Sequence, residues 1–220
     1  MRWSLLASLD DGEQRAVLAA ARSRSFAKGE IVFHEGDRSD SVHLVGAGHL
    51  AVVVSTPDGD LATLNVLGPG DWFGELSMLR EQAPTPRSAT IRSLDASQTW
   101  VLTQSAFHQL CKSHPGIERL VDNLRAARIR KLSADLLEAR YVDLDRRLYG
   151  ALLDLAAVFS DRDAGSLIPL TQDQLADMVG GTRPSVNQIL QRLAHEGVVQ
   201  IGRGKVMVLD AADLARRAGR

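Results

Sequence analysis

Glycines recur at nearly regular intervals in the first half of the chain. Gly36, Gly48, Gly59 and Gly70 lie 11 to 12 residues apart, and the segments between them alternate or run apolar. Glycine adopts the backbone conformations that reverse a chain tightly, so this spacing is typical of hairpins in a compact antiparallel sheet. The segment from about residue 31 to residue 102 therefore predicts a β-roll. Residues 1–25 are expected to form short helices that pack on that roll.

The pattern becomes helical at Pro115, and no proline or glycine follows Gly116 before Gly150. A helix of this length is longer than a surface helix that covers a small domain. Its apolar positions fall close to one stripe, which Arg125 interrupts: Ile117, Val121, Ile129, Leu132 and Leu136. Such a stripe favours a two-stranded coiled coil between subunits. The alternative is a long helix that lies over its own domain.

The last third of the chain has the pattern of a winged helix-turn-helix. Thr171 and Gln174 form a capping box that opens a helix, and Gly180-Gly181 ends it. Thr182 can cap a second helix, with Pro184 in its first turn, where a missing N–H costs nothing. Apolar residues then recur at helical spacing, at Val186, Ile189, Leu190 and Leu193. A hairpin follows in "VVQIGRGKVMVL", which completes the motif.

Polar and basic side chains remain on the outer face of the second helix and at the tip of the hairpin. These candidates for DNA contact are Thr182, Arg183, Ser185, Gln188, Gln191, Arg192, Arg203 and Lys205. Guanidinium and ammonium groups bind phosphates, and arginine also reads guanine in the major groove. The alternative is a helical hairpin whose outer face is merely solvated.

Charge and cysteine content narrow the possible functions. The net charge is −1, but residues 1–111 carry 9 basic and 13 acidic side chains, whereas residues 112–220 carry 17 and 14. This asymmetry permits nucleic-acid binding by the C-terminal half. The single cysteine, Cys111, excludes an internal disulfide or a four-cysteine metal site. Without a secretory leader or a long apolar run, the expected location is the cytoplasm, with no membrane partner.

We expect an α+β chain with three parts: an N-terminal antiparallel β-roll of residues 1–113, a dimerisation helix of residues 114–143 and a winged helix-turn-helix of residues 144–220. This order resembles the Crp–Fnr family of bacterial transcription regulators. The resemblance covers the chain from about Leu5 to Leu209. The segments that carry it are "FHEGD" (33–37), "GPGDWFGELSML" (68–79), "RSAT" (87–90), "DRRLYGALLDLA" (145–156) and "LTQDQLADMVGGTRPSVNQILQRL" (170–193).

The resemblance implies a cyclic-nucleotide cassette in the roll. Arg87 and Ser88 would hold the cyclic phosphate, with backbone N–H groups near Gly74 and Leu76 helping, and Glu75 would accept the ribose 2′-hydroxyl. The chemistry fits these roles, because a phosphodiester forms charge-assisted bonds to a guanidinium and a hydroxyl, whereas a carboxylate repels it and suits a hydroxyl group. The structural alternative is a salt bridge between Glu75 and Arg87 that closes an empty cassette.

The effector stays open at this point. In the cyclic-AMP-binding members, a Thr-Ser pair on the long helix contacts adenine, and the matching residues here are Leu132 and Ser133. Because the leucine side chain cannot hydrogen-bond a base, cyclic AMP becomes a less favoured candidate for the effector relative to cyclic GMP, a cyclic dinucleotide or no nucleotide at all. The resemblance further implies a homodimer that binds double-stranded DNA and works with RNA polymerase.

Two other functions are disfavoured by the residues. His108, Cys111 and His114 are spaced three apart, but Phe107, Leu110 and Cys111 have the pattern of a buried helix face, so we expect no metal or haem there. No G-x-S-x-G, P-loop or HExxH pattern occurs, so we expect no catalytic site and no enzyme activity.

Overall fold

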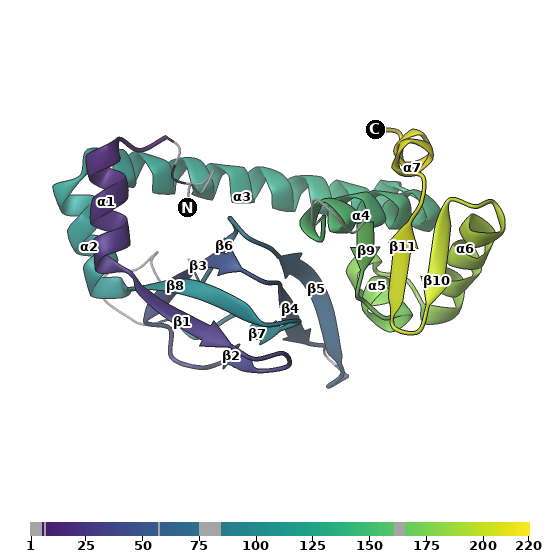
Figure 1. Cartoon of the computed structure of the whole chain (residues 1–220), viewed down its shortest axis with the longest axis horizontal. Coiled ribbons are helices and arrows are strands. Elements are labelled where there is room, and N and C mark those ends of the chain that lie inside the picture. Colours follow the sequence, from purple (N-terminus) through teal and green to yellow (C-terminus); the bar gives the residue numbers. More distant parts are fainter. Residues whose placement is uncertain (1–5, 7, 57, 75–84, 161–165) are drawn as a thin grey trace. The chain divides into compact units, whose positions relative to one another are not determined.

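The computed structural model describes residues 6, 8–56, 58–74, 85–160 and 166–220 (Figure 1). The chain divides into two compact units. The first comprises Met1–Ser55 with Leu67–Leu132, and the second comprises Thr56–Val66 with Ser133–Arg220. The long helix α3 (Pro115–Tyr141) contributes residues to both units, and the division falls between Leu132 and Ser133.

The roll contains two four-stranded sheets, with strand orders β1-β8-β3-β6 and β2-β7-β4-β5. The pairs β1–β8, β8–β3, β3–β6, β2–β7 and β7–β4 are antiparallel. The elements are α1 (Asp11–Ala20), β1 (Arg22–Phe26), β2 (Ile31–Phe33), β3 (Ser41–Ala47), β4 (Leu50–Ser55), β5 (Leu61–Leu67), β6 (Trp72–Phe73), β7 (Thr90–Ser93), β8 (Ser97–Thr103) and α2 (Gln104–Ser113).

Strand β3 shows how the roll is packed. Successive side chains of a strand point to opposite faces. Val42 and Leu44 join a cluster with the apolar faces of α1, α2 and the start of α3, and Figure 1 shows these helices side by side. Val45 joins a second cluster with Phe73 of its own sheet and with Leu50, Leu67 and Ile91 of the other. The two sheets therefore pack face to face, with helices on the outer face of one.

The predicted β-roll is confirmed, and one detail of the N-terminus is corrected. Residues 11–20 are helical as expected, and α1 opens with a capping box formed by Asp10 and Glu13. Residues 22–26, however, form strand β1 and not part of a helix. Pairing with β8 along its whole length, from Arg22 with Val101 to Phe26 with Ser97, satisfies its backbone in the sheet. Tertiary pairing has overridden the local pattern here.

The apolar stripe of α3 divides into two parts. Ile117 and Val121 are buried in the core of the first unit, so this end of the helix packs on its own domain. Farther along, Ile129, Leu132 and Leu136 are 65%, 54% and 54% exposed. A single stripe facing a partner was therefore wrong for the first two residues. The exposed part from Ile129 onward remains available to a partner helix.

The second unit has the expected winged helix-turn-helix. Its elements are α4 (Leu144–Val158), β9 (Ser166–Ile168), α5 (Gln172–Val179), α6 (Arg183–His195), β10 (Val199–Gly202), β11 (Lys205–Val208) and α7 (Ala211–Ala218). The three strands form an antiparallel sheet in the order β10-β11-β9. Apolar residues from every helix fill the core, among them Leu148, Leu152, Leu175, Leu190, Leu193 and Leu214, each fully buried.

Candidate ligand cassette and nucleic-acid interface

Arg87 is fixed at the edge of the roll by its own backbone. Its N–H donates to the carbonyl of Asp37, and its carbonyl accepts from the N–H of Gly36, both at 2.8 Å. The neighbouring residues Arg38 and Pro86 form an isolated antiparallel bridge. The glycine turn of "FHEGD" thus sets the place from which the Arg87 side chain extends.

The Arg87 guanidinium is held inside the protein. Nη1 donates to the carbonyl of Ser41 at 2.8 Å and to the carbonyl of Gly74 at 3.4 Å, and Nη2 donates to the Ser41 hydroxyl at 2.9 Å. The carboxylate of Asp40 lies 3.8 Å from Nη2. Only 4% of the Arg87 side chain is exposed, against 80% for Asp40. A buried cation needs acceptors of this kind. Among the described residues, Ser41 at the start of β3 supplies two of them, its carbonyl and its hydroxyl.

Aromatic rings line the inner side of this guanidinium. The Arg87 Cζ atom lies 3.9 Å from the centre of the Phe33 ring, within the range of a cation–π contact. Phe33 lies edge-on to the ring of His43, and His43 stacks on Phe73 with ring centres 4.8 Å apart. His43 Nδ1 is 3.1 Å from the hydroxyl of Thr99. The side chain of Arg87 is therefore packed as well as hydrogen-bonded.

His43 is uncharged in this setting. Burial is the main cause that lowers the pKa of its imidazole from 6.5 to about 3. The positive charges of Arg87 and Arg24 contribute to this shift, and the negative charge of Asp40 opposes it. A second positive charge beside a buried guanidinium would be repelled in a region that water does not reach. Among the described residues inside the cassette, Arg87 thus carries the positive charge and His43 does not.

The other predicted ligand residues are distributed as follows. Gly74 has φ +84°, and a Cβ there would lie 2.6 Å from Arg87 Nη1 and 2.8 Å from the Ser41 carbonyl, so only glycine fits. Ser88 is exposed next to Arg87. Leu132 and Ser133 are neighbours on α3 and are both exposed. The predictions for Glu75 and Leu76 fall outside the described residues.

Sequence reasoning missed Asp40 and Ser41 as the partners of Arg87. They lie 47 and 46 positions away in the chain, Asp40 directly before β3 and Ser41 as its first residue. A signal existed, because "SDS" places short polar side chains directly before a buried apolar strand, where acceptors for a buried cation would be needed. Their pairing with Arg87 depends on strand register, which the sequence pattern does not specify.

The helix-turn-helix is built as the sequence predicted. Thr171 and Gln174 form the capping box of α5, and Gly180 ends that helix in the left-handed region at φ 60°. Thr182 caps α6, where its hydroxyl accepts from the N–H of Ser185, and Pro184 lies in the first turn. The four predicted apolar residues of α6 are all buried. The polar side of α6 is consequently turned outward.

The start of α6 presents an arginine with an acidic neighbour. Arg183 is 66% exposed, and its Nε lies 3.5 Å from a carboxylate oxygen of Asp173 on α5. Thr182 and Ser185 share a hydrogen bond of 2.9 Å between their hydroxyls. Gln188, one turn along the helix from Ser185, is exposed. These residues lie together at the N-terminal end of α6.

Arg192 has a different environment from the other residues predicted to bind DNA. Its Nη2 pairs with the carboxylate of Asp145 and donates to the Tyr149 hydroxyl at 3.0 Å, both on α4. The hydrogen bond that Arg192 donates to Asp145 is the main cause of its raised pKa. This side chain connects α6 to α4 within the unit. The prediction treated every basic residue on the outer face alike, and the pairing with α4 separates this one.

The wing is a tight hairpin with a basic tip. Gly202 pairs with Lys205, so Arg203 and Gly204 form the connecting turn, and Gly204 has φ 67°. Arg203 and Lys205 are both exposed. The second unit therefore presents exposed cations at two places, Arg183 at the start of α6 and Arg203 with Lys205 at the tip of the wing.

Two family models match the chain on either side of α3. Residues 23–114 match the cyclic nucleotide-binding domain, and residues 146–217 match the Crp-like helix-turn-helix domain. The cyclic AMP receptor protein of Thermus thermophilus is 30% identical over 195 residues, which cover 89% of this chain and 87% of that protein. The chain belongs to the Crp–Fnr family.

Other relatives extend over almost the whole length. The CRP-like cAMP-activated global transcriptional regulator of Mycobacterium tuberculosis is 29% identical over 219 residues, which cover 96% of each chain. Among solved structures, the Thermus thermophilus catabolite activator protein is 30% identical, with a TM-score of 0.55 over 98% of each chain. The c-di-GMP-responsive regulator CLP of Xanthomonas campestris reaches a TM-score of 0.73 at 19% identity, over 90% of this chain and 99% of that one, which shows the fold alone.

These findings confirm the predicted class. The Crp–Fnr chain is a DNA-binding transcription regulator with a cyclic-nucleotide-type domain, and its relatives are regulators and not enzymes. Over the ranges that the structure describes, no group of three or more His, Cys, Asp or Glu side chains could hold a metal ion. Within the same ranges, none of the helices is both long and apolar enough to cross a membrane.

Proposed function

We propose that this regulator is a homodimer whose DNA binding is controlled by a cyclic nucleotide, with the phosphate held at Arg87. The observation that carries the proposal is that the Arg87 side chain is already held in a fixed, buried position. Among the residues that the structure describes, it is the one cation of a buried, aromatic-lined site, and Gly74 lets two backbone segments approach its guanidinium closely. A preorganised guanidinium is suited to a phosphodiester, which carries one negative charge and two free oxygens.

The remaining roles in the cassette follow from charge and position. The exposed hydroxyl of Ser88 can donate to the same phosphate from the residue that follows Arg87. Gly74 removes the side chain that would block the approach of a phosphate to the backbone. For Glu75 we keep the role of accepting the ribose 2′-hydroxyl, and for Leu76 that of a backbone donor, as the family resemblance implies. Ser41 acts through Arg87, because it accepts two hydrogen bonds that hold the guanidinium in place, and Asp40 adds a weak charge contact at 3.8 Å.

The dimer is supported by the exposed end of α3. Ile129, Leu132 and Leu136 recur at three- and four-residue spacing, and each exposes more than half of its side chain in the single chain. This is the pattern of a coiled-coil seam that a second copy covers. A dimer would also present two copies of α6 to DNA, as a two-fold symmetric operator requires.

The proposed effector is a cyclic nucleotide, but the identity of its nucleobase is open. The names of the Mycobacterium and Thermus relatives refer to cyclic AMP, and that of the Xanthomonas regulator refers to c-di-GMP. Leu132 replaces the threonine that the resemblance associates with adenine, whereas Ser133 can still hydrogen-bond a base. We therefore place cyclic AMP and cyclic GMP first and a cyclic dinucleotide second.

A second candidate function is a regulator that binds DNA without any nucleotide. One observation favours it: Ser41 and Gly74 already accept hydrogen bonds from the two terminal nitrogens of Arg87. In that case Arg87 would be a purely structural residue that ties β3 to the end of β6, and the cassette would be closed by the protein itself.

Calorimetric titration of the purified protein with cyclic AMP, cyclic GMP and c-di-GMP separates the two candidates. One of the three should bind, and Ser88→Ala should weaken it while leaving the fold intact, because Ser88 is exposed. The bound nucleotide should then change the affinity for operator DNA by about 5- to 150-fold, the usual range of coupling between two sites. Specific DNA binding with no nucleotide binding would establish the second candidate.

For DNA, we propose that α6 enters the major groove and that the wing contacts phosphates. Arg183 is placed to pair with guanine O6 and N7, and Gln188 favours adenine. Thr182 and Ser185 lie beside them at the start of the helix, where base edges or phosphates are within reach. Arg203 and Lys205 supply phosphate contacts from the wing. Activation would further involve RNA polymerase, and the expected site of action is the cytoplasm.

A further inference from the structure

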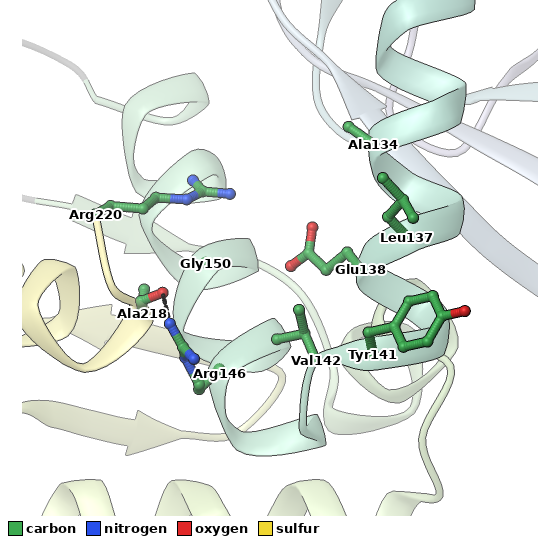
Figure 2. Close-up of a pocket in the computed structure, with 9 residues that line it drawn as sticks. All are labelled: Ala134, Leu137, Glu138, Tyr141, Val142, Arg146, Gly150, Ala218 and Arg220. Carbon is green, nitrogen blue, oxygen red and sulfur yellow. Dashed lines mark hydrogen bonds between the residues drawn. The ribbon is translucent and has the colours of Figure 1, made fainter.

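An open pocket lies in the second unit, away from both sites described above. Its volume is about 460 Å³, and it lies between the end of α3, the first half of α4 and the C-terminal end of α7 with Arg220 (Figure 2). The lining residues are Ala134, Leu137, Glu138, Tyr141, Val142, Arg146, Gly150, Ala218 and Arg220. The volume falls within the range of small-molecule sites in proteins.

The apolar part of this pocket is distinct from the proposed dimer seam. Each residue of an α-helix is turned by about 100° from the one before, so Leu137 is about 100° and Tyr141 about 140° from Leu136 of the seam. Leu137 is 60% exposed and Tyr141 is 78% exposed. A partner helix on the seam would therefore leave this face of α3 open.

The charged part of the pocket carries both signs. Figure 2 shows Arg220 and Glu138 extending toward each other across the opening between α3 and α4, while Arg146 turns toward Ala218. Arg146 Nη2 donates to the Ala218 carbonyl at 3.3 Å. Arg220 pairs with Asp154, whose hydrogen bond is the main cause of its raised pKa, and Glu138 adds to that effect. Two guanidinium groups and one carboxylate thus line a pocket with an apolar wall.

Gly150 forms the floor beneath these charges. It is buried in the interior of α4, where a glycine is less favourable than an alanine. A Cβ at this position would lie 3.2 Å from Arg220 Nη2 and 3.7 Å from Glu138 Oε1. The first distance is tight and the second is an ordinary contact, so the glycine makes room for the Arg220 guanidinium at the base of the pocket. A bound ligand that uses the space next to Gly150 would explain why a glycine is present inside this helix.

We propose that this pocket binds a small zwitterion with an apolar side chain, of the α-amino acid type. The ligand carboxylate pairs with Arg146 and with Nη2 of Arg220, whose Nη1 donates to Asp154, and the ligand ammonium group pairs with Glu138. The side chain of the ligand packs on Leu137 and Val142. A plain anion would be repelled by Glu138 and a plain cation by the two arginines, whereas a zwitterion satisfies all three groups.

Ligand-observed NMR titration of the full chain tests this proposal with three probes of the same hydrocarbon body. L-Leucine carries both charges, isocaproate lacks the ammonium group and isoamylamine lacks the carboxylate. Leucine should bind with a Kd of about 1 mM or tighter, and each of the other two should bind at least about tenfold more weakly. Equal binding of leucine and isocaproate would overturn the proposal, as would no binding of leucine up to about 10 mM.

Variants assign the binding to the pocket. Glu138→Gln should abolish the preference for leucine over isocaproate, and Arg146→Gln should weaken both. Arg216→Gln is the matched control, because Arg216 pairs with Asp213 on α7 and does not line the pocket. Gly150→Ala removes space at the floor while favouring the helix, so it should weaken leucine binding in a folded protein. If Arg216→Gln lowers the affinity as much as Arg146→Gln does, the binding is elsewhere and the proposal fails.

Discussion

Replacing Arg87 by alanine should destabilise the roll even when no nucleotide is present. The side chain is 4% exposed and makes two short hydrogen bonds, to the carbonyl and to the hydroxyl of Ser41. A hydrogen bond that involves a charged group contributes about 1.5–3 kcal/mol, so the pair accounts for about 3–6 kcal/mol. The longer bond to Gly74 and the distant, exposed carboxylate of Asp40 add little. Because the substitution also removes the cost of burying the charge, we expect a net loss near the lower end, about 3 kcal/mol.

Urea unfolding followed by tryptophan fluorescence measures this loss of stability in the first structural unit, which contains Arg87. The three tryptophans of the chain are at positions 3, 72 and 100, so all of them belong to the first unit. With a urea m-value of about 1–3 kcal/mol per molar, the midpoint for Arg87→Ala should fall by about 1–3 M. Arg24→Ala is the matched control, because Arg24 also lies over a phenylalanine ring, that of Phe26, but is exposed.

The result for the control should be within about 0.5 kcal/mol of the wild type, as is usual for an exposed side chain. If Arg87→Ala unfolds at the same urea concentration as Arg24→Ala, the hydrogen bonds to Ser41 contribute nothing to stability. Arg87 would then be a ligand residue that waits for its phosphate, and the reasoning from its burial would be refuted.

Further substitutions test the other parts of the chain. His43 has a pKa of about 3 in the folded protein, so below about pH 6.5 it binds a proton in the unfolded state but not in the folded state. The free energy of unfolding should therefore decrease as the pH is lowered below about 6.5. The loss should reach about 2 kcal/mol at about pH 5, and His43→Gln should remove it in the same fluorescence assay. Leu136→Glu should convert the dimer to monomer, as sedimentation at several concentrations would detect; an unchanged dimer would place the seam elsewhere. Arg183→Ala should cost about 1–3 kcal/mol of DNA affinity and relax one base position, whereas Lys205→Ala should weaken all sequences alike and reduce the salt slope by about one. Selection from random DNA checks both variants. If only Lys205→Ala changes the preferred sequence, the assignment of α6 to the major groove is wrong. Asp173→Asn should tighten DNA binding a few-fold at low salt, because a carboxylate beside Arg183 opposes the phosphates.

Much of the fold could be predicted because the sequence alternates between patterns with different periods. Glycine turns at 11 to 12 residues gave the roll, and helical spacing gave α3 and α6. The caps of α5 and α6 were predicted to the residue, because a capping box and an N-terminal proline are local signals that the surrounding structure rarely overrides. Strand β1 was missed because its five residues have a helix-compatible pattern and acquire their conformation from β8.

The partners of charged side chains were much harder to predict. Arg192 and Arg183 are both basic residues on the polar side of α6, and the sequence offers no reason to separate them. The structure places Asp145 and Tyr149 next to Arg192, whereas Arg183 has the exposed Asp173 as a neighbour. The difference depends on how α4 crosses α6, which is set by packing between helices and not by any local signal.

The same limit applies to Arg87, and there it bears on regulation. The motif around this residue suggested a salt bridge to Glu75 or a bound phosphate as the two alternatives, and the structure adds a third set of partners in Ser41 and Asp40 at the start of β3. A nucleotide phosphate must compete with these acceptors or add to them. If it competes, binding releases the start of β3, whose next residues Val42 and Leu44 pack against α1, α2 and the beginning of α3. A change at the phosphate would then reach the long helix through one strand, since that strand contacts the guanidinium at its first residue and the helical layer at its second and fourth.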